Sequence, residues 1–279
     1  MKLSPLVGSA LLLLSLAATA TGAIAAGPTV PEPEVTLRPA DFSQGAYDLA
    51  LTIGLPEGWH TYWRNPGDVG VPPLISTEGS ENVGALKVAF PAPVRHFDGY
   101  AESIVYEGGV TLPLRLTPGE PGEPVHLKLS LLFGYCLDIC VPGQADFDLT
   151  LAPDMATDAA VESVLTDARS HVPMPEGEGA PAQLVSFDPH GESNGKPVYR
   201  LVVETAKPAD GKVDVFAEGP EGWSLPLPRP VAVDGDEGNR HVFDLTIDGL
   251  PRKADPHGAD LRFTIVAGDK AVEAVRKLP

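Results

Sequence analysis

Cysteine and basic residues are both scarce in this sequence of 279 residues. It has two cysteines, and its 20 Lys and Arg face 38 Asp and Glu, which gives a formal net charge of -18. Because so acidic a protein repels the phosphate backbone, we expect no nucleic-acid partner. After residue 27, no run approaches the roughly 18 apolar residues that a membrane-spanning helix needs. Motifs of serine hydrolases, zinc proteases and nucleotide-binding sites are missing from the strand-and-helix context that each requires.

The first 26 residues differ from this polar background. Lys2 supplies a short positive region, Leu11–Leu16 an apolar centre, and Ala23-Ile24-Ala25 a pattern of small residues typical of a cleavage site. We interpret this stretch as a secretory signal peptide, with an uncleaved membrane anchor as the alternative. The mature chain would then lie in an oxidising compartment, a bacterial periplasm, where disulfides form.

Turn-forming residues are frequent, with 29 Gly and 30 Pro, and this favours short strands over long helices. Tyr47, Leu49, Leu51 and Ile53 alternate with Asp48, Ala50 and Thr52, which is typical of a half-buried strand. Similar runs separated by Pro, Gly, Asn and Asp follow at 85–90, 103–105, 110–116, 125–133 and 145–151. Short strands at this spacing predict a β-sandwich.

One segment breaks the strand pattern. Residues 157–169 carry apolar side chains at helical spacing, so we expect an amphipathic helix whose start Thr157 caps. Residues 172–181, with three Pro and two Gly, have the composition of a linker. Strand-like runs then resume between residues 184 and 267. The predicted fold class is all-β, with two β-sandwich domains joined by a short helix and a Pro/Gly-rich linker. The expected boundaries are 1–26 for the signal peptide, 27–152 and 182–279 for the sandwiches, and 153–181 for the helix and linker.

The two cysteines, Cys136 and Cys140, lie in the segment FGYCLDICVP. Extended backbone would separate their Cα atoms by roughly 13 Å, whereas a disulfide needs about 4.4 to 6.8 Å. A disulfide between them therefore requires a turn at residues 137–139. So small a ring stabilises a fold by roughly 2 kcal/mol, against about 5 kcal/mol for a loop of about 100 residues. We therefore favour a bond that opens and closes by thiol exchange over one that holds the fold together.

Two other roles for the cysteines stay open. The bond is purely structural, or the reduced thiols bind Cu(I) or Zn together with His60 or His96. No CxxC or HxxxH pattern elsewhere completes a ligand set, so we expect no metal and no other cofactor. Tyr135, next to Cys136, either donates a hydrogen bond to a sulfur or packs in the core.

Aromatic residues gather in two segments that precede the cysteines. In GWHTYWRNPGDVG, the side chains of Trp59, Tyr62 and Trp63 pack in the core, or the following turn presents one of them at a loop. In HFDGYAES, Phe97 and Tyr100 lie in a glycine-containing loop. This loop is either a surface turn or a cover over a reactive group.

Together these segments resemble the N-terminal periplasmic domain of the DsbD family of thiol:disulfide interchange proteins, and its ScsB-like branch in particular. The resemblance covers roughly residues 40–151. It rests on three blocks in matching order and spacing: GWHTYWRNPGDVG, FDGYAESIVYEGGVTLPL and FGYCLDICVP with its following strand. In that family the domain is an immunoglobulin-like sandwich that passes electrons from a membrane-embedded domain to periplasmic proteins of thioredoxin fold. The ScsB-like branch has two such sandwiches, in agreement with the second predicted β-domain.

The resemblance implies that Cys136 and Cys140 are the redox pair. It implies that the loop of the second block caps the disulfide, with Phe97 or Tyr100 as an aromatic lid, and it places Tyr62 beside the cysteines. The implied electron acceptor is a periplasmic thioredoxin-fold protein. Full members continue into transmembrane and thioredoxin domains that do not follow within these 279 residues. A separate membrane-embedded protein is therefore the expected electron donor.

We thus expect a periplasmic thiol–disulfide interchange protein, an oxidoreductase of the protein-disulfide reductase type. Its two cysteines would cycle between dithiol and disulfide. Which of them attacks first stays open, because the more familiar family pattern has a longer gap between its cysteines. The alternatives are a non-catalytic immunoglobulin-like binding or assembly module with a structural disulfide, and a copper-handling protein.

Overall fold

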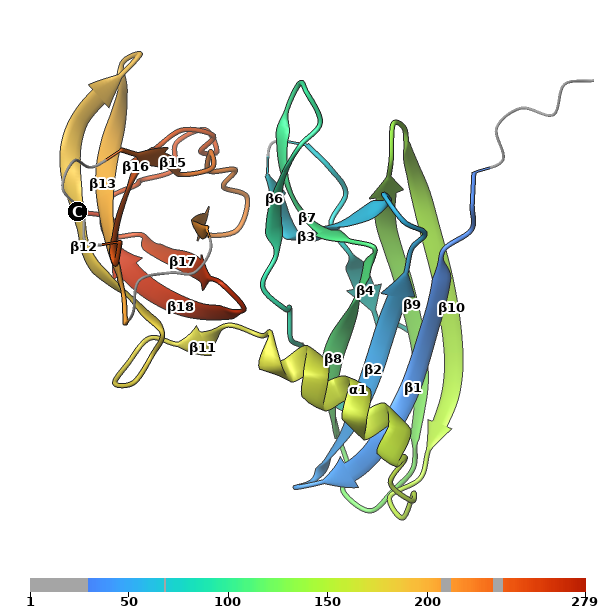
Figure 1. Ribbon diagram of the computed structural model, residues 1–279. Coiled ribbons are helices and arrows are strands. Elements are labelled where there is room, and N and C mark those ends of the chain that lie inside the picture. The colour runs from blue at the N-terminus through green and yellow to red at the C-terminus, as the bar shows by residue number, and fades with distance from the viewer. Residues whose placement is uncertain (1–29, 68, 207–211, 233–237) are drawn as a thin grey trace, which may run out of the picture. The chain divides into compact units, whose positions relative to one another are not determined.

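The computed structural model describes residues 30–279 except 68, 207–211 and 233–237 (Figure 1). The predicted signal peptide lies outside the described residues. Two antiparallel sheets precede the helix. One has the order β1 (Glu34–Ser43), β2 (Ala46–Gly54), β8 (Gly109–Pro118), β5 (Val83–Val88). The other has the order β10 (Cys140–Leu151), β9 (Val125–Cys136), β3 (His60–Gly67), β7 (Glu102–Glu107), β6 (Val94–Phe97), with β4 (Leu74–Ser76) paired to β9.

The core between these two sheets follows from the alternation of side chains along the strands. Leu49 and Leu51 of β2 point inward, as do Leu127 and Leu129 of β9, and all four belong to one buried cluster. Burying each such side chain contributes about 1.5–3 kcal/mol. The period-two pattern therefore identified the inward face of β2 correctly.

The prediction that β2 is buried on one face only was wrong. Its second face is covered by helix α1 (Ala159–Ser170), which lies across β1, β2 and β8 (Figure 1). Ala50 of β2 packs with Val161 and Leu165 of the helix in a small buried cluster. A helix that follows the last strand of a sandwich can cover a small-residue strand face in this way, and alternation within the strand alone does not reveal it.

The helix begins one residue later than predicted. Its N-cap is Asp158, not Thr157, and Asp158 Oδ1 accepts hydrogen bonds from the backbone N of Ala160 at 3.0 Å and of Val161 at 3.2 Å. These bonds satisfy amide groups that have no partner within the helix. They also lower the pKa of the Asp158 carboxyl, the bond from Val161 most of all.

Residues after the helix form a second pair of sheets, each with four described strands. Their orders are β11 (Met174–Pro175), β18 (Lys270–Lys277), β17 (Asp260–Ala267), β14 (Val213–Glu218), and β12 (Ala182–Ser193), β13 (Lys196–Thr205), β16 (Arg240–Thr246), β15 (Arg229–Val231). The letters GESNG at 191–195 resemble a serine-hydrolase motif, but they close the β12–β13 hairpin and precede no helix. The predicted fold class, all-β with two immunoglobulin-like sandwiches and a short helix, is confirmed.

The segment with linker composition makes specific contacts. Within it, β11 pairs in parallel with β18, a strand that the sequence pattern did not reveal. The carboxylate of Glu176 accepts hydrogen bonds from the backbone N of Leu184 and from Nη2 of Arg276, both at 2.7 Å. These bonds tie the segment to the sandwich that follows it.

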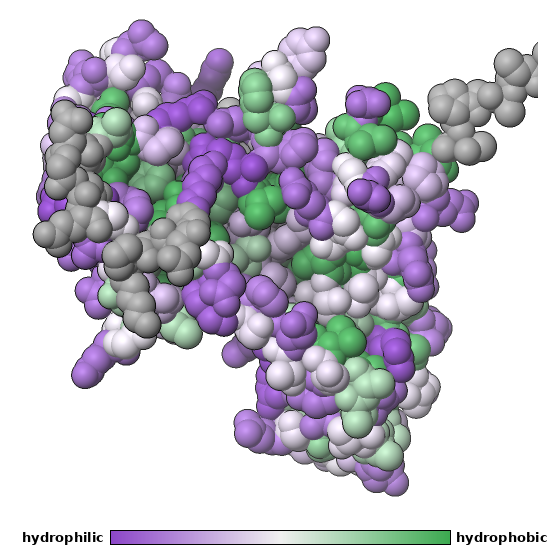
Figure 2. All heavy atoms as spheres, viewed as in Figure 1, coloured by the Kyte–Doolittle hydropathy of each residue, from purple (hydrophilic) through white to green (hydrophobic). Residues whose placement is uncertain are grey.

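Apolar side chains lie mainly inside the sandwiches. On the face that Figure 2 shows, hydrophilic residues surround smaller groups of hydrophobic ones. In the part of the chain that the structure describes, no helix has the length and apolar character needed to cross a membrane.

Candidate functional site

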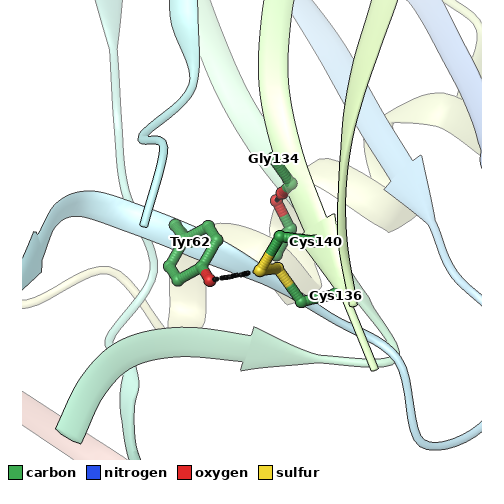
Figure 3. Close-up of a disulfide and its surroundings, with 5 residues drawn as sticks. Tyr62, Gly134, Cys136 and Cys140 are labelled. Atoms are coloured by element: carbon green, nitrogen blue, oxygen red, sulfur yellow. Dashed lines mark hydrogen bonds between the residues drawn. A yellow bond between two sulfur atoms is a disulfide. The ribbon is translucent and has the colours of Figure 1, made fainter. Parts of the chain in front are cut away.

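The two cysteines form a disulfide at the closed end of the β9–β10 hairpin (Figure 3). Cys136 is the last residue of β9 and Cys140 the first of β10, and the two are directly opposite each other in the ladder. Their Cα atoms are 4.2 Å apart. The predicted turn at residues 137–139 is confirmed, with Leu137 N donating to the carbonyl oxygen of Ile139 at 3.3 Å.

The two cysteines differ in exposure. Cys136 is 1% exposed and packs with Tyr62 and Val105, which come from the neighbouring strands β3 and β7. Cys140 is exposed and lines a cavity. A thiol that arrives from solution therefore meets Cys140 first.

Tyr62 makes the closest polar contacts with the disulfide (Figure 3). Its hydroxyl lies 3.0 Å from Sγ of Cys136 and 3.3 Å from Sγ of Cys140. A disulfide sulfur carries no hydrogen, so the tyrosine hydroxyl must be the donor. Burial raises the pKa of Tyr62, and the nearby charge of Asp98 raises it further. The hydroxyl therefore keeps its proton and its donor role at neutral pH.

The position of Tyr62 is set by its strand and by two glycines. Thr61 Oγ1 donates to the carbonyl oxygen of Gly134 at 2.8 Å, which fixes β3 against β9. At Gly134, a Cβ would lie 3.2 Å from the Tyr62 ring. At Gly70, where φ is +118°, a Cβ would lie 2.3 Å from Cε1 of Tyr62. The tyrosine ring occupies the space that the missing side chain of Gly70 leaves.

A cavity of about 480 Å³ opens beside Cys140. Tyr62 and Gly70 lie on its walls, and Tyr100 belongs to the wall that the loop between β6 and β7 contributes. Tyr100 is 96% exposed, so the loop borders the disulfide without burying Cys140. Asp98 shapes this loop, because its Oδ1 accepts from the backbone N of Ala101 at 2.9 Å and of Tyr100 at 2.8 Å. The bonds from Ala101 and Tyr100 lower the pKa of the Asp98 carboxyl.

Two of the residues expected near the disulfide do not contact it. Tyr135 lies in the core, with its ring 5.3 Å from that of Trp59 and 5.9 Å from that of Phe133. Successive side chains of a strand point to opposite faces, so Tyr135 turns away where Cys136 turns toward Tyr62. Phe97 is 63% exposed at the end of β6, and the described lining of the cavity does not include it. Of the two roles left open for Tyr135, the structure shows core packing, so Tyr135 does not shield the sulfurs. Tyr100, not Phe97, lines the cavity.

Two histidines lie on the same sheet as the disulfide. His60 is opposite Cys136 in the β3–β9 ladder, and its ring lies 4.5 Å from that of His96 and 5.6 Å from that of Tyr62. Burial lowers the pKa of His60, and the neighbouring His96 lowers it further, so His60 is neutral at pH 7. Within the described residues, no group of three or more His, Cys, Asp or Glu side chains is arranged to hold a metal.

Mild acid should destabilise the protein through His60. Because its folded pKa lies below the usual 6.5, the unfolded chain binds a proton that the folded one refuses. Above about pH 7.5, His60 is neutral in both states and does not destabilise the fold. As the pH drops below about 6.5, the unfolding free energy falls by up to about 1.4 kcal/mol per pH unit. Denaturant titrations at several pH values in this range should show that the unfolding free energy of His60→Gln falls less steeply as the pH drops than that of the unchanged protein. His190→Gln, at an exposed histidine, is the control. If the pH dependence of stability were unchanged in His60→Gln, His60 would not be its cause.

Comparison with known proteins agrees with this geometry. Residues 28–152 match the family model described as thiol:disulfide interchange protein DsbD, N-terminal. This segment is a DsbD N-terminal domain. The match contains the three blocks on which the resemblance was based, and thiol–disulfide interchange is the activity that names the family. Curated proteins give no significant match to the chain.

The likeness in three dimensions extends beyond the DsbD N-terminal domain. The crystal structure of the N-terminal periplasmic domain of ScsB from Proteus mirabilis superimposes with a TM-score of 0.68 at 21% sequence identity. The superposition covers 90% of this chain and 96% of that chain. At this identity the likeness shows the fold, and it includes the sandwich that follows the DsbD N-terminal domain.

Proposed function

We propose that this protein is a periplasmic thiol–disulfide carrier that passes electrons to thioredoxin-fold proteins through Cys136 and Cys140. The observation that carries the proposal is the placement of the disulfide. It closes a short hairpin turn between adjacent strands, where it adds little to stability. One of its cysteines is open to solvent, and a tyrosine hydroxyl donates to both sulfurs. The DsbD family match and the periplasmic ScsB neighbour support the compartment and the class of partner.

The exchange begins with the exposed cysteine. In the reduced protein, the Cys140 thiolate attacks a sulfur of the partner's disulfide, and the partner's other sulfur leaves and takes up a proton. The Cys136 thiolate then attacks Sγ of Cys140. This step breaks the mixed disulfide, releases the partner as a dithiol and restores the Cys136–Cys140 bond. Two electrons and two protons have passed to the partner, and a separate membrane-embedded dithiol returns the pair to its reduced form.

Tyr62 assists this cycle. The same hydroxyl that donates to the two sulfurs of the disulfide can donate to a thiolate after reduction. A hydrogen bond to the charged form lowers a thiol pKa and increases the fraction of the reactive thiolate.

The surroundings of Cys140 suit a protein partner. Several large apolar side chains are exposed next to the turn and on the cavity rim: Val69, Val71, Leu137 and Ile139. Apolar groups around a reactive centre are typical of a docking surface. A thioredoxin-fold protein, which carries its own reactive cysteine at an apolar surface, would bury both sulfurs in such a complex.

The reduction potential of the disulfide tests the proposal. Equilibration in thiol buffers should give a value above about -300 mV, in the range of exchanging rather than structural disulfides. Replacement of both cysteines by Ser should lower the unfolding free energy by no more than roughly 2 kcal/mol, because the ring is small. A potential below about -300 mV together with a large loss of stability would instead indicate a binding module with a structural disulfide.

A further inference from the structure

The loop that borders Cys140 belongs to a hairpin at the edge of its sheet. Strand β6 is the last strand in the order β10-β9-β3-β7-β6, so among the described strands it pairs with β7 alone. The ladder runs from Val94 opposite Val105 to Phe97 opposite Glu102, and the loop follows at 98–101. Strand pairing therefore holds the loop from one side only.

The two faces of this hairpin have different neighbours. Val105 packs with Tyr62 and Cys136 on the face of the disulfide. Residues at alternate positions point to the opposite face, where Ile104 is buried with Phe216 and Leu227 of the second sandwich. The second sandwich therefore packs against the reverse side of the hairpin that carries the loop.

Arg95 links one leg of the hairpin to the second sandwich. Its Nε donates to Asp214 Oδ2 at 3.0 Å and its Nη2 donates to Asp214 Oδ1 at 2.8 Å, a bidentate pair. Nη2 also donates to the carbonyl oxygen of Pro228 at 2.9 Å. The side chains of Arg95 and Asp214 are 8% and 11% exposed. Bidentate pairs of this kind fix geometry tightly, and removal of one partner leaves the other with longer ion pairs only: Arg95 with Glu102 at 3.4 Å, or Asp214 with Lys212 at 3.6 Å.

Glu102 links the other leg. Its Oε2 pairs with Nη1 of Arg229 from the second sandwich at 2.6 Å and with Nη1 of Arg95 at 3.4 Å. Arg95 and Glu102 stand on either side of the loop, two residues before Phe97 and directly after Ala101. Both ends of the loop are thus tied to the second sandwich through one connected set of charges.

We propose that the second sandwich positions the loop beside Cys140, with Arg95 and Glu102 as positioning residues and Asp214 and Arg229 as their anchors. This inference rests on the proposed function only in taking the Cys136–Cys140 bond as the reactive group. Held in this way, the loop forms a fixed wall of the cavity and limits the approach of small thiols to Cys140. Release of the loop removes the wall.

Asp214→Asn tests this role in the full chain, because it breaks the bidentate pair while nearly keeping the side-chain volume. We expect the second-order rate of disulfide reduction by dithiothreitol to rise on the order of tenfold, since the freed loop opens locally. The reduction potential should stay unchanged. Arg229→Gln, at an anchor that is 68% exposed, should raise the rate in the same direction by a smaller factor.

Glu218→Gln is the matched control. Glu218 pairs with Arg64 at 2.7 Å between the same two sandwiches, but Arg64 belongs to the inner strand β3 and not to the hairpin. This variant should reduce at the rate of the unchanged protein. An equal increase in Glu218→Gln and Asp214→Asn, or no increase in Asp214→Asn, would overturn the proposal. Should Asp214→Asn fail to fold, an unchanged rate in Arg229→Gln would overturn it as well.

Arg95 supplies an internal check. Because Arg95 and Asp214 act through one another, adding Arg95→Gln to Asp214→Asn should change the rate little further, and independent, multiplying effects would contradict the proposal. Dithiothreitol is not a protein partner. If the protein exchanged with no thioredoxin-fold partner, its variants would therefore still show the expected rates with dithiothreitol. If the second sandwich did not hold the loop, the measured reduction potential of the disulfide would be unchanged.

Discussion

Cys136→Ser should form a mixed disulfide with a thioredoxin-fold protein readily, and Cys140→Ser should do so far more slowly. The remaining thiol of the first variant is the exposed Cys140, whereas that of the second is Cys136, which is 1% exposed behind Tyr62 and Val105. Access and thiolate character together control the rate of exchange, so we expect a difference on the order of 100-fold. The measurement is the rate at which each variant displaces thionitrobenzoate from a thioredoxin that keeps only its attacking cysteine.

The same two variants in denaturant provide the control. There both thiols are exposed, and their rates should converge to within a few fold. Equal rates in the folded state, or a faster Cys136, would refute the assignment of Cys140 as the attacking residue. Normal reaction with a small aromatic disulfide but none with the thioredoxin would instead refute the choice of partner.

The strand pattern predicted the architecture because side chains alternate along each strand whatever the partner strand is. It could not predict the second buried face of β2, since that burial depends on helix α1 crossing β1, β2 and β8. Nor did it reveal β18, whose residues follow the last predicted run. For β2 the missing information lies in contacts with a helix that is distant in the chain, whereas β18 forms a hairpin with its neighbour β17.

In the candidate site, too, local features were predictable from the sequence and contacts between distant residues were not. A distance argument on Cys136 and Cys140 was enough to predict the turn between them, because the constraint is local. The sequence left open whether Tyr135 contacts a sulfur or packs in the core. Because it is adjacent to Cys136, it lies on the opposite face of the strand, and it packs in the core. Arg95 and Asp214 are 119 positions apart, and neither residue stands in a motif, so only the folded chain shows that they meet.

Gly70→Ala should be one of the most damaging single-methyl changes in the DsbD N-terminal domain. The new Cβ would lie 2.3 Å from the Tyr62 ring at a residue whose φ is +118°. Overpacking costs about 1–3 kcal/mol, and the backbone strain adds about 1–2 kcal/mol. We expect a loss of roughly 2–5 kcal/mol of unfolding free energy in denaturant titrations. Gly122→Ala, at φ +88° with open space around it, should lose only the smaller, backbone part.

Removal of the Tyr62 ring separates the two parts of that loss, overpacking and backbone strain. In a Tyr62→Ala background the new methyl meets no ring, so Gly70→Ala should then cost about 1–2 kcal/mol, the strain alone. Gly143→Ala places a methyl 2.5 Å from the Phe133 ring in the core, and should destabilise the fold without changing the rate of disulfide reduction. Gly70→Ala should change that rate, because a displaced Tyr62 withdraws its hydroxyl from both sulfurs. Strict additivity of Gly70→Ala and Tyr62→Ala would show that the glycine is needed for its backbone conformation and not to make room for the tyrosine.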